Sequence, residues 1–191
     1  MESIERQCHL YLGIGARIWV KATQIKEIHK IVGATKGAFI VSASHRIIKW
    51  DNEIQIVSNQ EDKVYDTISK DQGVLDTLFG KFQLEWIDNA GELKIDTSAN
   101  MAYLDADVLS WPLLNRSWVA TDYFYPLGMR KKKKLNHFLG NLKLSPAIKA
   151  KTTVLCSDSK IVWVVGQRID ERLKITPNTK QVLKITFLSK S

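Results

Sequence analysis

The residues with the clearest chemical potential in this sequence form a short run of cations. Residues 128–140 read GMRKKKKLNHFLG, so one arginine and four lysines (Arg130 to Lys134) precede an apolar segment. Lysine and arginine side chains bind phosphate groups, and the open backbone N–H groups at a helix N-terminus bind them too. The helix macrodipole opposes each cation at that end by about 0.3–1 kcal/mol, and a bound polyanion would relieve this cost. The pattern predicts a phosphate-binding surface, with a merely solvated lysine-rich surface as the alternative.

The charge is unevenly distributed along the chain. The formal net charge is +8 over 191 residues. Residues 118–191 contain 15 Lys and Arg against 4 Asp and Glu, whereas residues 1–117 contain 13 against 16. A basic C-terminal part beside a slightly acidic remainder indicates a localised site for a polyanion.

Motifs that carry catalysis are missing from the sequence. There is no GxSxG elbow and no GxxxxGK[ST] phosphate loop. Asp170 and Glu171 stand among Arg168, Arg172 and Lys174, which favours local ion pairs over acid–base chemistry. The four histidines are isolated, without the spacing of metal ligands: His9, His29, His45 and His137. We therefore predict no catalytic and no metal-binding residue in this chain.

The composition is typical of a globular protein in a reducing compartment. Hydrophobic residues make up 45% and charged residues 25% of the chain. No apolar run approaches the roughly 20 residues that span a bilayer, and MESIERQCHL is not a signal peptide. Cys8 and Cys156 lie far apart and are interpreted as packed thiols, so a cytoplasmic location is expected.

The elements that must position the cations are clearest in the last third of the chain. Leu135, Phe138, Leu139 and Leu142 recur at i, i+3, i+4 and i+7, which predicts one apolar helix face. This helix is expected to begin within the cationic run, with the cations around its first turn, and to end at Ser145-Pro146.

The rest of the chain is predicted to be mainly β. A helix is expected at residues 17–31, an exposed polar excursion at 58–71, and a hairpin turn at 88–91. Strands are expected at 38–41, 46–50, 53–57, 82–87, 92–96, 101–104, 118–125, 153–156, 161–165 and 180–188. The fold class is therefore α+β: a mostly β core with a basic amphipathic helix, preceded by a smaller helical segment.

Four short motifs in the last third follow one another in the order found in a known family. They are PLGM at 126–129, KKL at 133–135, KLSP at 143–146 and IVWVVGQRI at 161–169. Over about residues 118–187 the chain resembles the C-terminal domain of bacterial tRNA(Ile)-lysidine synthase. The expected division is a helical tail of an upstream domain at 1–32, a β-rich part at 33–117 and the basic lysidine-synthase-like domain at 118–191.

The resemblance implies both a fold and a parent activity. The family domain is sandwich-like, an arrangement that it shares with part of phenylalanyl-tRNA synthetase. The family's enzyme is an ATP-dependent ligase that joins lysine to the anticodon cytidine of isoleucine tRNA. Its catalytic half carries an SGGxDS loop, which this sequence lacks. The chain is therefore expected to be a C-terminal fragment, inactive alone and without a cofactor of its own, since the missing domain uses the ATP.

The resemblance also implies partners. They are tRNA, held chiefly at the acceptor stem, and the upstream catalytic domain; a membrane is not expected, and a homodimer is left open. The candidate tRNA-binding residues are Arg130, Lys131, Lys132, Lys133, Lys134, Lys143, Lys149, Lys151 and Arg168. The alternative is a protein-interaction or assembly module whose basic surface binds an acidic partner.

Overall fold

The computed structural model describes residues 7–11, 17–21, 27, 29–42, 44–59, 63–88 and 93–190. The chain divides into two compact units, one formed by residues 1–62 with 144–150 and the other by residues 63–143 with 151–191. We call them the N-terminal unit and the sandwich unit. The division predicted from the sequence, at residues 32 and 117, stays a prediction. In the described part of the chain, no helix is long and apolar enough to cross a membrane.

The sandwich unit contains an antiparallel five-stranded sheet in the order β15-β14-β13-β10-β6. Alternation along β10 sends Leu113 and Asn115 to one face and Arg116 to the other. The strands are β6 (Tyr65–Ile68), β10 (Leu113–Ser117), β13 (Thr153–Ser157), β14 (Lys160–Val164) and β15 (Arg168–Ile169).

A second antiparallel sheet of the same unit has the order β7-β8-β16-β9. Its centre is the long pair of β8 and β16, which runs from Gln181 opposite Asp88 to Ser189 opposite Gly80. The strands are β7 (Val74–Asp76), β8 (Gly80–Asp88), β9 (Met101–Asp105) and β16 (Gln181–Ser189). A short 3-10 helix follows β9 at Ala106–Val108, and another follows β15 of the first sheet at Glu171–Leu173.

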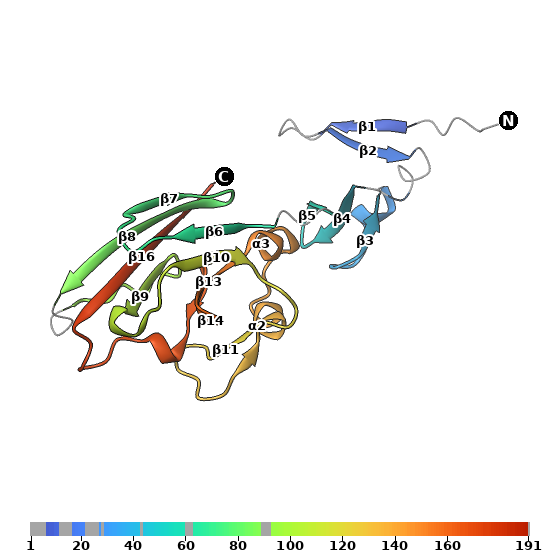
Figure 1. The fold of residues 1–191 in the computed structure, drawn as a ribbon. Coiled ribbons are helices and arrows are strands. Elements are labelled where there is room, and N and C mark those ends of the chain that lie inside the picture. Colours follow the sequence, from blue (N-terminus) through green and yellow to red (C-terminus); the bar gives the residue numbers. More distant parts are fainter. Residues whose placement is uncertain are drawn as a thin grey trace. The chain divides into compact units, whose positions relative to one another are not determined.

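The hydrophobic core lies between these two sheets (Figure 1). Phe82 of β8 meets Trp163 of β14 edge to face, with ring centroids 6.3 Å apart. Each large side chain that is fully buried stabilises the fold by about 1.5–3 kcal/mol. The cluster includes Ile68, Leu113, Leu155 and Trp163 from the first sheet and Phe82, Leu84, Leu104, Leu183 and Ile185 from the second.

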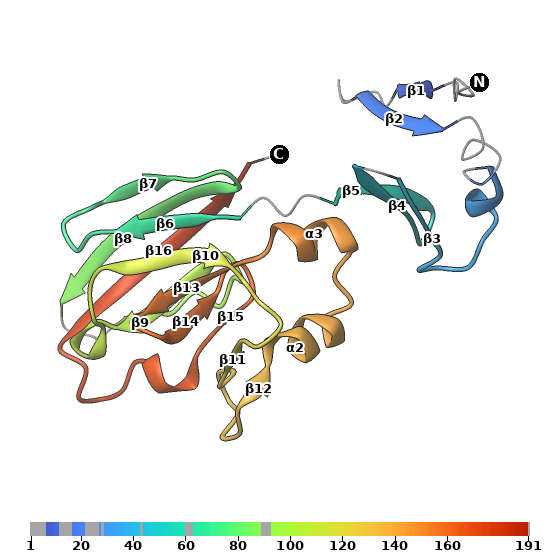
Figure 2. The same cartoon turned by 45° about the vertical axis from the view of Figure 1, so that its right-hand side comes forward.

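The opposite face of the five-stranded sheet is covered by a short helix and a two-stranded hairpin (Figures 1 and 2). The helix is α2 (Leu135–Asn141), and the hairpin pairs β11 (Tyr123–Phe124) with β12 (Lys133–Lys134). Leu135, Phe138 and Leu139 of α2 are buried, as their helical spacing predicts. Phe124 packs edge to face on Phe138 at 4.9 Å between ring centroids.

Among its described residues, the N-terminal unit contains two small antiparallel sheets and helical segments at 27–32 and in α3. The hairpin of β1 (Gln7–Tyr11) and β2 (Arg17–Lys21) is one sheet. The other has the order β3-β4-β5: β3 (Phe39–Val41), β4 (His45–Trp50) and β5 (Glu53–Ser58). Helix α3 (Pro146–Lys151) meets β5, where the Ala147 N–H donates to Gln55 Oε1 at 3.3 Å.

The mostly β fold predicted from the sequence is confirmed, and most strands lie where alternation placed them. The helix predicted at 17–31 is wrong at Arg17–Lys21, because that segment pairs with β1; helix occurs at residue 27 and at 29–32. Ile25 and Ile28 lie outside the described residues. The polar excursion at 58–71 contains β6, because Ile68 is fully buried in the core and outweighs its polar neighbours.

Two other strand predictions are wrong because of tertiary pairing. Residues 93–98 form no strand, and β8 pairs with β7 and β16 instead of forming the predicted hairpin with 92–96. The strand predicted at 118–125 is reduced to Tyr123–Phe124, because a turn held by Asp122 follows β10. Pro146 does not end the first helix but begins α3, a position where its missing N–H costs nothing.

A substitution of Gly80 tests how closely β8 and β16 pack against each other. A Cβ at this position would lie 2.5 Å from the Leu188 carbonyl oxygen and from the Phe187 ring. We expect Gly80→Ala to lower the free energy of unfolding by about 1–3 kcal/mol, because the long strand pair must shift. Gly73→Ala is the control, since nothing lies within 4 Å of its Cβ position. Urea melts that show equal stability for the two variants would contradict this packing.

Candidate nucleic-acid interface

The cationic run lies in a hairpin that precedes the helix. We call residues 123–134 the basic hairpin. Tyr123 pairs with Lys134 and Phe124 with Lys133, and Gly128 makes the turn between the strands with φ 86°. Helix α2 begins only at Leu135, after an extended Lys134. The prediction that the cations surround the first helical turn is therefore wrong.

Electrostatics explains this difference between expectation and structure. A helix start would crowd the five cations at the positive end of the macrodipole. In the hairpin, Arg130 and Lys131 lie in a bend away from any helix start, and Lys133 and Lys134 lie in a strand, where successive side chains point to opposite sides. The apolar residues after the run still form the helix that the 3.6-residue period predicts, because Phe138 and Leu139 bury against the sheet.

Backbone amides of the hairpin are engaged within the protein. Gly128 N–H donates to Glu171 Oε2 at 2.8 Å and Met129 N–H to the Pro126 carbonyl at 2.8 Å. Leu127 N–H donates to the Ile169 carbonyl at 3.0 Å. Gly128 and Met129 therefore do not supply the open backbone N–H groups that were expected beside the cations at a helix N-terminus. At these positions, an anion would be contacted by side chains and not by backbone amides.

Buried Asp170 fixes one side of the hairpin. Its carboxylate is fully buried and accepts hydrogen bonds from the Tyr125 N–H at 2.9 Å and from the Arg172 N–H at 2.9 Å. The Arg172 guanidinium adds two more, from Nε at 2.8 Å and from Nη2 at 2.9 Å. The hydrogen bond with Asp170 raises the pKa of Arg172. Because four donors converge on one carboxylate, the hairpin and the segment after β15 form one rigid structure.

Glu171 supports the same side of the hairpin from the surface. It forms an ion pair with Lys174 and accepts the Gly128 N–H. The hydrogen bond from Lys174 lowers the pKa of Glu171 most, and the bond from the Gly128 N–H lowers it further. The predicted local ion pairing is thus confirmed for Asp170 with Arg172 and for Glu171 with Lys174. Arg168 instead donates to the Leu127 carbonyl at 3.5 Å.

Asp122 holds the other side of the hairpin. Arg116 of β10 donates to both of its carboxylate oxygens, at 2.8 and 2.9 Å, and this bidentate bond raises the pKa of Arg116. The Asp122 carbonyl accepts the Leu135 N–H at 2.8 Å, which fixes the start of α2. Cys156 is a buried free thiol whose pKa burial raises, in line with its interpretation as a packing residue.

The cations of the run differ in their surroundings. Arg130, Lys131, Lys132 and Lys134 are exposed. Lys133 is half-buried, with Nζ 5.9 Å from the Phe138 ring centroid. When Asn141 donates its amide N–H to the His137 carbonyl, its oxygen faces Lys133 Nζ at 3.1 Å. Lys133 therefore contributes to the packing of α2 as well as to the surface.

The remaining predicted cations lie at different places. Arg168 is exposed and contacts the hairpin. Lys143 is exposed after α2 with φ 52°, and Lys151 is exposed at the end of α3. Lys149 belongs to the N-terminal unit. Whether these nine residues bind tRNA stays a prediction.

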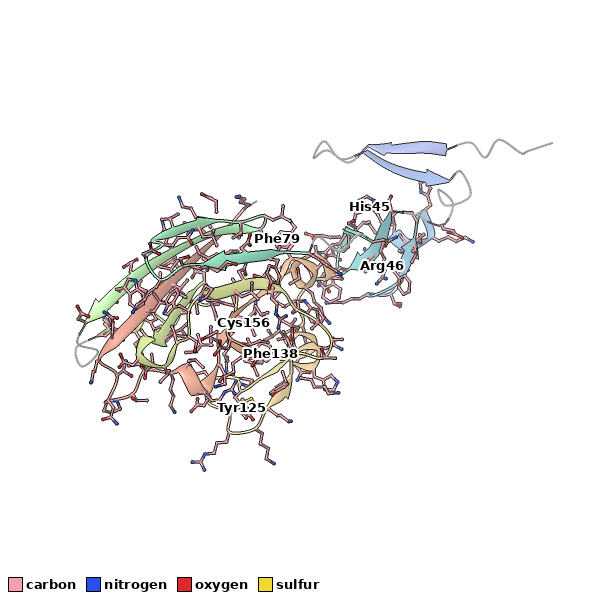
Figure 3. The ribbon with its side chains drawn as sticks, in the orientation of Figure 1. His45, Arg46, Phe79, Tyr125, Phe138 and Cys156 are labelled. Atoms are coloured by element: carbon pink, nitrogen blue, oxygen red, sulfur yellow. The ribbon has the colours of Figure 1, made fainter. Side chains whose placement is uncertain are left out.

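Sequence reasoning missed Arg172 as a member of this surface. Its ion pair was expected, but not that the guanidinium would lie over an aromatic ring, with Cζ 4.4 Å from the Tyr125 centroid (Tyr125 is labelled in Figure 3). No local pattern in the sequence signals this contact, because Tyr125 and Arg172 lie far apart along the chain. Among the described residues, no group of three His, Cys, Asp or Glu side chains could hold a metal ion.

Comparisons with known proteins give this surface a family context. Residues 115–185 match the family model described as the TilS substrate C-terminal domain, close to the 118–187 range predicted from the motifs. The tRNA(Ile)-lysidine synthase of Parabacteroides distasonis is 35% identical over 157 residues, which cover 80% of this chain and 35% of that protein. That of Bacteroides thetaiotaomicron is 30% identical over 162 residues, which cover 85% of this chain and 35% of that protein.

A solved structure supports the fold. The crystal structure of a TilS C-terminal domain matches with a TM-score of 0.53 at 12% identity, and the match covers 68% of this chain and 99% of that one. The chain spans about a third of the length of the curated relatives, 35% for the first. The predicted resemblance is confirmed: the chain is similar to the C-terminal region of tRNA(Ile)-lysidine synthases and carries their C-terminal domain.

Asp170 provides a direct test of how the hairpin is anchored. Asp170→Ala removes four hydrogen bonds and leaves Tyr125 N–H and the Arg172 side chain without this acceptor. We expect a loss of about 3 kcal/mol in the free energy of unfolding, because one partner of a buried ion pair is removed. Glu171→Ala, beside it on the surface, should cost clearly less. If chemical denaturation ranks the two variants the other way, the anchor is assigned to the wrong carboxylate.

Proposed function

We propose that this chain is the tRNA-binding C-terminal region of a tRNA(Ile)-lysidine synthase, and that the basic hairpin contacts the tRNA backbone. The observation that carries the proposal is the hairpin itself: Arg130, Lys131, Lys132 and Lys134 are exposed on a loop that buried carboxylates hold in place. A cluster of cations on a fixed loop suits a polyanion of regular charge spacing, because little loop entropy remains to be lost on binding.

Within tRNA, a helical stem is the best match for this surface. Side chains cannot read bases in the deep major groove of an A-form helix, so proteins contact its phosphates and 2′-hydroxyls. Lysine and arginine side chains on a narrow hairpin can make such contacts without base readout. We assign the acceptor stem to this surface, following the implication of the family resemblance. Arg168 extends the surface, because it contacts the hairpin at Leu127.

The activity of the whole enzyme belongs to the same proposal. In the lysidine synthases that this chain resembles, lysine is joined to the anticodon cytidine with ATP. We propose that the chain supports that reaction by holding the tRNA, while a catalytic domain carries the SGGxDS loop and uses the ATP. Within the chain itself, the role of the hairpin residues is binding and orientation.

Salt dependence measures how many hairpin cations meet phosphates. If the four exposed cations each neutralise one phosphate, log K falls against log salt with a slope of about −3, so affinity for tRNA drops roughly 60-fold between about 50 and 200 mM salt. Arg130→Ala with Lys131→Ala should make this slope shallower by about 1.5, half of its value. The fold should be unaffected, because both side chains are exposed.

A matched charge control is available in the same unit. Lys160→Ala with Lys180→Ala removes two exposed cations outside the hairpin and should leave the slope close to that of the wild type. Filter binding or fluorescence titration over a salt series gives each slope. A flat response in the wild type, or equal changes in both double variants, would instead favour an acidic protein partner for this surface.

A further inference from the structure

One side of the basic hairpin carries two tyrosines next to two cations. Tyr123 and Tyr125 are two residues apart, so their side chains leave the extended backbone on the same side, while Phe124 between them is fully buried. Tyr123 is 51% exposed. Both phenol groups lie close enough to Arg172 to contribute, after its hydrogen bond with Asp170, to the raised pKa of that guanidinium.

Two cations lie over the aromatic rings, and one of them, Arg172, is held there by hydrogen bonds. Lys132 Nζ is 5.1 Å from the Tyr123 ring centroid, and Arg172 Cζ is 4.4 Å from that of Tyr125. Arg172 cannot easily leave this position, because buried Asp170 binds its Nε and Nη2. The Arg172 guanidinium is thus a planar group that is fixed over the Tyr125 ring and close to Tyr123 before any ligand binds.

Such a surface matches unpaired nucleobases. Flat bases stack on tyrosine rings and on arginine guanidinium planes, and neighbouring cations bind the phosphates between them. A double-stranded stem cannot use the rings, because its bases are already stacked. The rings would therefore add affinity only where the RNA has single-stranded nucleotides next to the stem.

We propose that Tyr123, Tyr125 and Arg172 form a stacking platform for one or two unpaired nucleotides that adjoin the RNA stem held by the basic hairpin. This inference rests on the proposed function, since the hairpin must first hold an RNA stem. It adds a second class of contact: the lysines bind the stem backbone, and the tyrosine–arginine side of the hairpin selects RNA that carries a single-stranded extension.

The test compares two RNAs that differ only in the extension. One is a blunt RNA stem, and the other is the same stem with a short single-stranded 3′ extension. The wild-type chain should bind the extended stem about tenfold more tightly. Tyr123→Leu should abolish this gain, so that the variant binds the two RNAs equally. Tyr123→Phe, which keeps the ring, should behave as the wild type.

Control variants separate stacking from other effects. Tyr65→Leu replaces a tyrosine that is 75% exposed on β6 and should change neither affinity. Arg172→Lys keeps the charge but loses the planar group, so it should lose part of the gain from the extension; a melting curve shows whether it stays folded. The exposed position of Tyr123 makes its variants the decisive pair if Arg172→Lys does not fold.

The possible results distinguish this inference from the proposed function. If the wild type binds both RNAs equally, or if Tyr123→Leu weakens both to the same degree, the stacking platform is wrong while stem binding by the hairpin stands. If Tyr123→Phe loses as much as Tyr123→Leu, the hydroxyl and not the ring makes the contact, and the platform is again wrong. If the wild type binds neither RNA, the proposed function fails as well.

Discussion

The position of the basic hairpin depends on the ion pairs that Asp122 and Asp170 make at its two sides. Five consecutive cations repel one another, so they would not hold a defined turn by themselves. On one side, Asp122 forms an ion pair with Arg116 of the five-stranded sheet. On the other side, Asp170 binds Arg172 and the Tyr125 amide. Both carboxylates are largely buried, where their interactions are screened less by salt than those of the exposed cations. The anchor should therefore persist under conditions that weaken phosphate binding.

This arrangement gives the cations a different role from the one that a helix terminus would give them. At a helix start, phosphate would be bound jointly by the dipole, the free amides and the side chains. In the hairpin, the amides of Leu127, Gly128 and Met129 already donate to Glu171 and to backbone carbonyls, so the recognition that we propose rests mainly on side chains. Such contacts follow the spacing of phosphates rather than a single phosphate group. That difference favours a long regular polyanion, such as an RNA stem, over a small phosphorylated ligand.

Sequence patterns predicted an element correctly where the spacing of its own apolar residues determines its structure. They failed where the structure depends on pairing with residues far away in the chain. The alternation of Lys184 with Leu183 and Ile185 predicts β16, and the spacing of Leu135, Phe138 and Leu139 predicts the buried face of α2. Nothing local distinguishes Arg17–Lys21 from a helix, because its strand form depends on pairing with β1. The cluster of cations was visible in the sequence, but its place in a hairpin was not. That place depends on Asp170, which lies 45 residues after Tyr125, and on Glu171, which lies 43 residues after Gly128.

The acidic residues show how the charge of this region is organised. Residues 118–191 contain only 4 Asp and Glu. Three of them, Asp122, Asp170 and Glu171, bind the hairpin or the residues that flank it, and only Asp158 lies in another turn. Negative charge is thus concentrated beneath the hairpin, where it fixes the backbone and positions Arg172, while the outer side remains positive. This placement of the few carboxylates supports the RNA-binding surface that we propose over a merely solvated lysine-rich surface.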